Sequence, residues 1–156
     1  MDEPRWLDEH EMAAWRGFIA AGILLERRLD QQLKEDAGLS HPQYEILSRL
    51  GDAPGGELRM SGLADLLLTS KSGLTYQVGQ LEKAGLVSRR ACSSDVRGVV
   101  AALTDAGRER LRDSAPGHVA LVRELLIDVL DREQLAALAD SLGTVSRRLR
   151  SGTEAT

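Results

Sequence analysis

The sequence predicts a mainly α-helical protein that carries one small β-hairpin. Aromatic residues make up only 3% of the 156 residues, and leucine and alanine dominate the apolar positions. Apolar residues recur at three- and four-residue steps over most of the chain, which is the period of amphipathic helices. The period changes only around residues 86–103, where two short apolar runs flank a turn-rich stretch. The length suits one domain with its own core.

The first predicted element is a long helix over residues 8–36. Its apolar positions share one helical stripe with charges between them, and they are Met12, Trp15, Ile19, Gly22, Leu25, Leu29 and Leu33. Ala37-Gly38 is a typical C-terminal stop. A second helix should begin near Ser40-His41-Pro42, because a capping side chain followed by proline suits a first turn. Residues 51–56 predict a loop.

Two shorter helices follow, joined by a tight turn. The first is expected over residues 60–67 with Ser61 as its N-cap, and residues 68–70 form the turn. The second is expected over residues 71–84, with Leu74, Val78 and Leu81 facing inward and Gly85 ending it. Two short helices with this spacing predict a helix-turn-helix.

A β-hairpin is predicted next, with strands at residues 86–90 and 99–103 around a turn at residues 92–98. Thr104 should cap another helix. A hairpin of this size after a helix-turn-helix predicts a winged helix-turn-helix, in which the hairpin is the wing.

The remaining chain is predicted to be helical again. A helix from Asp105 to about residue 130 should be broken or kinked near Pro116, and a last helix should run from Arg132 to about Arg150. The last helix carries a narrow apolar stripe suited to helix pairing, formed by Leu135, Leu138, Leu142, Val145 and Leu149.

Charge is distributed unevenly along the chain. The formal net charge is −4, but residues 57–100 carry 6 basic and 4 acidic side chains and are the net-basic third. A local basic face suffices to meet phosphates. No apolar run approaches the ~20 residues that cross a bilayer, and the acidic start resembles no targeting peptide. A cytoplasmic protein with no membrane partner is expected.

The order of several short motifs resembles the MarR family of bacterial regulators. They are Leu63-Ala64-Asp65, Ser70-Lys71-Ser72, Leu81-Glu82-Lys83-Ala84-Gly85-Leu86-Val87, Asp95-Val96-Arg97-Gly98 and Leu103-Thr104-Asp105-Ala106-Gly107-Arg108. The resemblance implies dimerisation through the helices of residues 1–38 and 105–152, around a winged helix-turn-helix at residues 39–104. It also implies control of nearby promoters, often relieved by a small molecule.

The N-terminal face of the helix at residues 71–84 is the candidate for the major groove. Its polar and small residues can meet phosphates or base edges, and they are Ser70, Lys71, Ser72, Gly73, Thr75, Tyr76 and Gln77. The family position matched by Tyr76 often carries a basic residue, so the tyrosine predicts a different operator. The alternative is a solvated helix face.

In the wing, Arg97 matches the arginine that the family inserts into the minor groove, and Asp95 is expected to hold it by an ion pair. Arg89 and Arg90 are candidates for phosphate contacts. The alternative is a charged hairpin tip that only keeps the protein soluble.

Cys92 lies at the end of a wing strand. We interpret it as a thiol without a function rather than as a redox sensor, and a single cysteine forms no internal disulfide.

A small-molecule effector is the other expected ligand. The aromatic candidates are Trp15 and Tyr44, with Arg16 or His41 able to meet an anion, although core packing also explains the aromatics. No metal site or cofactor is predicted, because His10, His41 and His118 are far apart in sequence and lack zinc-like spacing.

These observations predict a homodimeric DNA-binding transcription regulator, a repressor that reads a pseudo-palindromic operator in double-stranded DNA and is released by an aromatic or anionic effector. No enzymatic motif is present in the sequence, so no catalytic residue is assigned. A winged helix that binds a protein partner instead of DNA is the alternative.

Overall fold

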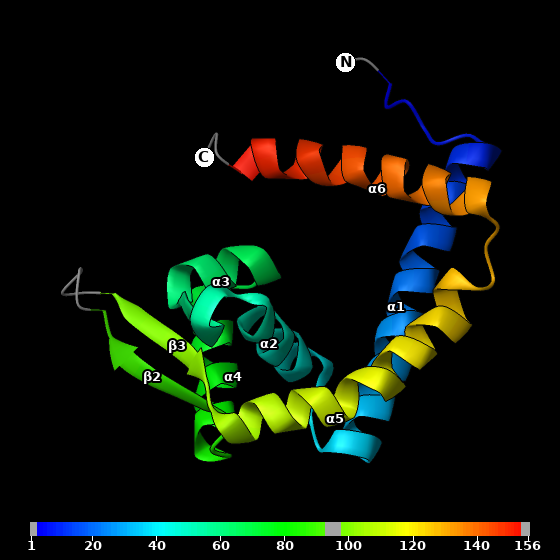
Figure 1. The fold of residues 1–156 in the computed structure, drawn as a ribbon. Coiled ribbons are helices and arrows are strands. Elements are labelled where there is room, and N and C mark those ends of the chain that lie inside the picture. The colour runs from blue at the N-terminus through cyan, green and yellow to red at the C-terminus, as the bar shows by residue number, and fades with distance from the viewer. Residues whose placement is uncertain (1–2, 93–97, 154–156) are drawn as a thin grey trace. The chain divides into compact units, whose positions relative to one another are not determined.

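The computed structural model describes residues 3–92 and 98–153. They form helices and one three-stranded antiparallel sheet (Figure 1), which confirms the predicted fold class. The chain divides into two compact units, Met1–His118 and Val119–Thr156, and each is described by itself. The hairpin predicted at residues 86–103 is present, although its tip, residues 93–97, lies outside the described residues.

Helix α1 (Glu9–Ala37) has well-defined ends. Asp8 and Glu11 form a reciprocal capping box, which satisfies amide groups that the first turn leaves unpaired. At the other end, Gly38 takes the left-handed conformation with φ 65°, where a side chain would be strained. The Arg110 guanidinium also donates to the Ala37 carbonyl over 2.8 Å. The predicted helix and its stop are therefore confirmed.

Helix α2 (His41–Asp52) begins where Ser40 and Pro42 predicted. The Ser40 hydroxyl accepts from the Gln43 amide, and the Gln43 side chain accepts from the Ser40 amide in return. The expected loop at residues 51–56 is shorter than predicted, because Gly51 and Asp52 still belong to α2. A single 3₁₀ turn, η1 (Pro54–Gly56), follows.

A short strand that sequence reasoning missed, β1 (Glu57–Arg59), precedes helix α3 (Met60–Leu67). It pairs with β3 (Val99–Leu103), which also pairs with β2 (Val87–Ala91), giving the order β1-β3-β2. Because β1 runs directly into α3, the last extended residue is Arg59, which occupies the N-cap position. The prediction that Ser61 caps this helix is wrong, since Ser61 already lies inside the first turn.

Helix α4 (Lys71–Lys83) follows a tight turn in which Leu68 has φ 54°. Leu74, Val78 and Leu81 point inward as predicted, each at most 2% exposed. They pack in one core with buried leucines of α1, α2 and α3, and with residues of both hairpin strands. The helix-turn-helix and the hairpin are thus anchored to a common core, with β2 and β3 extending beside α4 (Figure 1).

Helix α5 (Asp105–Val122) starts as predicted, because the Thr104 hydroxyl accepts from the Gly107 amide over 3.0 Å. Of the predicted break or kink near Pro116, the break is wrong: α5 continues through Pro116, and an irregular π turn, η2, comes later at Arg123–Ile127. A proline removes one backbone hydrogen bond, and the flanking turns hold this helix together.

The second unit contains η2 and helix α6 (Arg132–Thr153), so α6 extends slightly beyond the predicted end. Asp131 and Gln134 form a capping box at its start. Within the described residues, no helix combines the length and the apolar character needed to span a membrane.

Candidate nucleic-acid interface

The start of α4 presents a polar surface that is built by the sequence around Ser70. The Ser70 hydroxyl accepts a hydrogen bond from the Gly73 amide over 3.1 Å and lies 3.4 Å from the Ser72 hydroxyl. Ser70 therefore caps the helix, while the first-turn amides and the positive end of the helix dipole face outward. This arrangement favours an anionic group such as a phosphate.

Gly73 lies close to the capping hydroxyl. A Cβ at this position would lie 3.0 Å from the Ser70 hydroxyl and 3.3 Å from the Thr69 hydroxyl. A side chain would therefore push against the two groups that shape the helix start.

The other predicted groove residues lie on the same outward face. Lys71, Ser72 and Thr75 are exposed, and the Tyr76 side chain is 64% exposed. The Thr75 hydroxyl donates to the Lys71 carbonyl over 2.8 Å, so it turns back along the helix. Gln77 is half-buried one turn further on. The structure thus brings the predicted α4 residues together on one accessible end of the helix.

The two arginines at the base of the wing are each held by a carboxylate. Arg89 donates to Glu82 from both its backbone amide and its guanidinium, each over 3.0 Å. The Arg89 hydrogen bond keeps the pKa of the Glu82 carboxyl below its ordinary value, with desolvation opposing. This double contact ties β2 to the C-terminal part of α4.

The Arg90 guanidinium donates to both carboxylate oxygens of Glu57 over 2.8 Å. Arg90 lies on β2 and Glu57 on β1, so the ion pair spans the central strand β3. A phosphate that binds either arginine would either share the guanidinium with the paired carboxylate or displace that carboxylate from it. Asp95 and Arg97, the predicted residues of the wing tip, lie outside the described residues.

A groove of about 410 Å³ runs between the start of α4 and the wing. Its lining includes two residues that sequence reasoning missed, Arg59 and Ser61, next to Lys71, Thr75 and Arg89. Arg59 is the last residue of β1 and Ser61 lies in the first turn of α3, and only recognition of that strand would have placed them here. The groove joins the two predicted DNA-contacting elements into one continuous surface.

The four predicted effector residues do not gather in one place. His41 and Tyr44 lie in the first turns of α2, where Tyr44 is buried at 5% exposure. Trp15 and Arg16 are exposed on α1, and Trp15 lies 11 residues before Glu26, the α1 residue that contacts His41. That separation corresponds to roughly 16 Å along a helix. An effector role for these residues stays a prediction.

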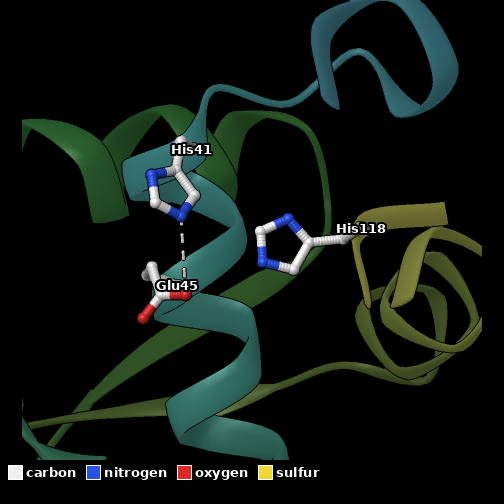
Figure 2. A group of neighbouring side chains, drawn as sticks. All are labelled: His41, Glu45 and His118. Carbon is white, nitrogen blue, oxygen red and sulfur yellow. Dashed lines mark ion pairs between the residues drawn. The ribbon is translucent and has the colours of Figure 1, made fainter. Parts of the chain in front are cut away.

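The structure instead brings His41 together with two residues that were not linked in sequence, Glu45 and His118 (Figure 2). His41 Nε2 lies 3.7 Å from a Glu45 carboxylate oxygen, and the His41 and His118 ring centroids are 5.5 Å apart. His118, from α5, is 8% exposed and packs on Tyr44 with ring centroids 4.3 Å apart. We call His41, Glu45 and His118 the histidine cluster.

The charges of the histidine cluster are coupled. The Glu45 carboxylate raises the pKa of His41, Glu26 adds to that effect, and burial opposes it. The interaction with His41 in turn lowers the pKa of Glu45. Burial lowers the pKa of His118, helped by the positive charge of His41. The cluster therefore favours an ionised Glu45, a protonated His41 and a neutral His118.

The family model described as the MarR family matches residues 37–98. The chain is 41% identical to AbsC, a MarR family transcriptional regulator from Streptomyces coelicolor, with a TM-score of 0.91 over 95% of this chain and 99% of AbsC. It is 44% identical to Sco3205 of the same organism, whose structure is a complex with DNA, with a TM-score of 0.90 over 92% and 94% of the two chains. Among curated relatives, the HTH-type transcriptional repressor YetL of Bacillus subtilis is 32% identical over 97 residues, 62% of this chain and 58% of YetL.

Proposed function

The chain belongs to the MarR family of transcription regulators, and from this premise we propose that it binds operator DNA as a homodimer through α4 and the wing. The family and the relatives regulate transcription and are not enzymes. The observation that carries the proposal is the exposed, capped start of α4, which shares a groove with the base of the wing. The DNA complex of Sco3205, at 44% identity, supports the same assignment.

In this proposal the start of α4 enters the major groove. Hydroxyl groups of Ser70, Ser72 and Thr75 meet phosphates or base edges, and Lys71 adds a positive charge. Tyr76 is the one aromatic residue of α4, and its 64% exposure leaves the ring free to reach the groove. Gln77 is the residue whose amide matches an adenine edge. These contacts would set the sequence preference.

The wing supplies the second contact. Arg97 inserts into the minor groove, where narrow A·T-rich segments concentrate negative potential, and Asp95 orients it. Arg89 and Arg90 meet phosphates at the base of the wing. The ion pairs with Glu82 and Glu57 keep both arginines positioned before DNA arrives.

A homodimer is supported by apolar side chains on the surface of α1. Trp15, Ile19 and Ile23 follow one another at four-residue spacing and are 56%, 37% and 48% exposed. Large exposed apolar stripes of this kind are typical of interaction surfaces. Two copies related by a two-fold axis would place their α4 helices ~34 Å apart, one turn of B-form DNA.

We further propose that the regulator is a cytoplasmic repressor whose DNA affinity falls when a small aromatic or anionic effector binds. The repressor YetL supports the direction of control. An effector acts only if it binds more tightly to a conformation with the wrong helix spacing. Trp15, Arg16, His41 and Tyr44 remain the candidate contacts for it.

The wing assignment is tested by Arg97→Ala, with Arg112→Ala as the matched control. Arg112 is a highly exposed arginine of α5 outside the proposed DNA surface. Fluorescence anisotropy with an operator selected from random DNA, at fixed salt, should show the Arg97 variant binding at least about 5-fold more weakly, since one good base or groove contact contributes ~1–3 kcal/mol. The control should bind like the parent protein, and equal affinity of all three proteins would defeat the wing assignment.

A further inference from the structure

The histidine cluster has the composition and spacing of a transition-metal site. Its ligand atoms, one from each of His41, Glu45 and His118, all lie within 4.8 Å of one another. We propose that these three residues bind a divalent cation of the zinc class. Imidazole nitrogens and a carboxylate are ligands that zinc takes in proteins, commonly three of them with water in the fourth position.

Glu26 is the positioning residue of this site. Its carboxylate lies 2.7 Å from Nδ1 of His41, so it can accept a hydrogen bond from the N–H group at that nitrogen. A cation would displace the proton of Nε2, the nitrogen that faces Glu45 at 3.7 Å, because metal binding requires the neutral imidazole. A carboxylate that orients a metal-binding histidine through its other ring nitrogen is a recurrent feature of zinc sites.

The distance between the two ligands on α2 requires only a small movement, and His118 must move closer from within 4.8 Å. Two ligand atoms at ~2.0–2.2 Å from one zinc ion lie roughly 3.3 Å apart, and the 3.7 Å between His41 and Glu45 is already close to this value. His41 and Glu45 are four residues apart on α2, on one helix face, so they approach the cation from a rigid support. His118 completes the set from α5 (Figure 2).

His118 provides an independent indication. The residue is only 8% exposed, and its buried Nδ1 atom has no hydrogen-bond partner among the described residues. Buried polar atoms without a partner are rare and call for an explanation. If residue 118 only packed against Tyr44, an apolar side chain would suffice. Coordination of a cation, in contrast, requires an imidazole nitrogen.

Charge also favours a cation here. Glu45 and Glu26 bring two carboxylates to the cluster, and these match the two positive charges of the ion. A bound cation would link α2, which begins the DNA-reading core, to α5. Its binding should therefore raise the melting temperature of the protein, because it favours the folded state.

The test uses tag-free, full-length protein stripped of metal with a chelator. Titration with Zn²⁺ against a chromophoric chelator should give one tight site per chain, and Co²⁺ should produce the visible absorption of a low-symmetry site. His118→Gln and Glu45→Gln should each lower the Zn²⁺ affinity more than about 100-fold, and Glu26→Gln should lower it by about 10- to 100-fold.

His10→Gln is the matched control, because His10 is exposed on α1 away from the cluster, and it should keep the parent affinity. Circular dichroism of the metal-stripped variants identifies any that fail to fold. If His118→Gln fails to fold, the half-buried Glu45→Gln variant decides the question. A parent protein without a stoichiometric site, or a folded Glu45 variant with unchanged affinity, would overturn the proposal. None of these readouts depends on DNA binding.

Discussion

Gly107 lies where helix α5 packs against the base of the hairpin. It is buried at the start of α5, and a Cβ at this position would lie 2.1 Å from the backbone oxygen of Leu86 and 2.8 Å from the Leu103 side chain. Leu86 leads into β2 and Leu103 ends β3. The absence of a side chain at residue 107 therefore allows α5 to pack directly on the root of the hairpin.

Gly107→Ala should destabilise the protein, because the new methyl group meets backbone that cannot move without displacing β2. Overpacking of this kind costs about 1–3 kcal/mol, measured as the free energy of unfolding in urea. Gly62→Ala in α3 is the control, since nothing lies within 4 Å of its Cβ position. The control should be neutral or gain up to about 1 kcal/mol. Similar stability of the two variants would contradict the proposed close contact.

At the scale of elements, the turn between α3 and α4 depends on an unusual backbone conformation. Leu68 has φ 54° and ends α3, where its amide donates toward the carbonyls of Ala64 and Asp65. The left-handed region disfavours residues with a Cβ by roughly 1–2 kcal/mol. The side chain of Leu68 is 71% exposed and contributes little to the core.

Leu68→Gly should therefore be more stable than Leu68→Ala by about 1 kcal/mol, since both remove the leucine side chain and only glycine relieves the strain. Thermal and urea unfolding of the two variants measure the difference. If the alanine variant proved as stable as the glycine variant, strain in this turn would not be the explanation.

The elements that could be predicted from sequence are those with a local signal. Helix α4 and both hairpin strands were placed correctly because apolar periodicity and Gly85 mark them. Strand β1 was missed because three residues carry no detectable alternation, and its pairing with β3 depends on chain more than 40 residues away. The Ser61 cap was wrong for the same reason, since the unrecognised strand sets where α3 starts.

At the scale of the whole molecule, the sequence predicted the fold class and which end of α4 is exposed, but not the histidine cluster. His41 and His118 lie in different helices, and no local spacing links them. Glu45 was overlooked because a single carboxylate on an amphipathic helix has no distinguishing signal. Only the packing of α5 on α2 brings the three residues together.

Homodimer formation is tested on the apolar stripe of α1. Ile23→Asp places a carboxylate at a position that is 48% exposed in one chain and would be buried in the dimer. Burial of an unpaired charge costs roughly 3 kcal/mol or more, so the dissociation constant of the dimer should rise at least about 100-fold. Sedimentation velocity over a concentration series measures it. Ala21→Asp introduces the same charge on a different face of α1 and should leave the dimer intact. If Ile23→Asp left the dissociation constant unchanged, α1 would not belong to the dimer interface.

The most direct test of the central claim, that paired α4 helices and wings read one operator, is selection of DNA sites from a random pool by the purified protein. The account predicts an enriched pseudo-palindrome whose half-sites are centred about 10 base pairs apart, one helical turn or a small multiple of it. Enrichment of a single unrepeated motif, or no enrichment at low salt, would contradict it.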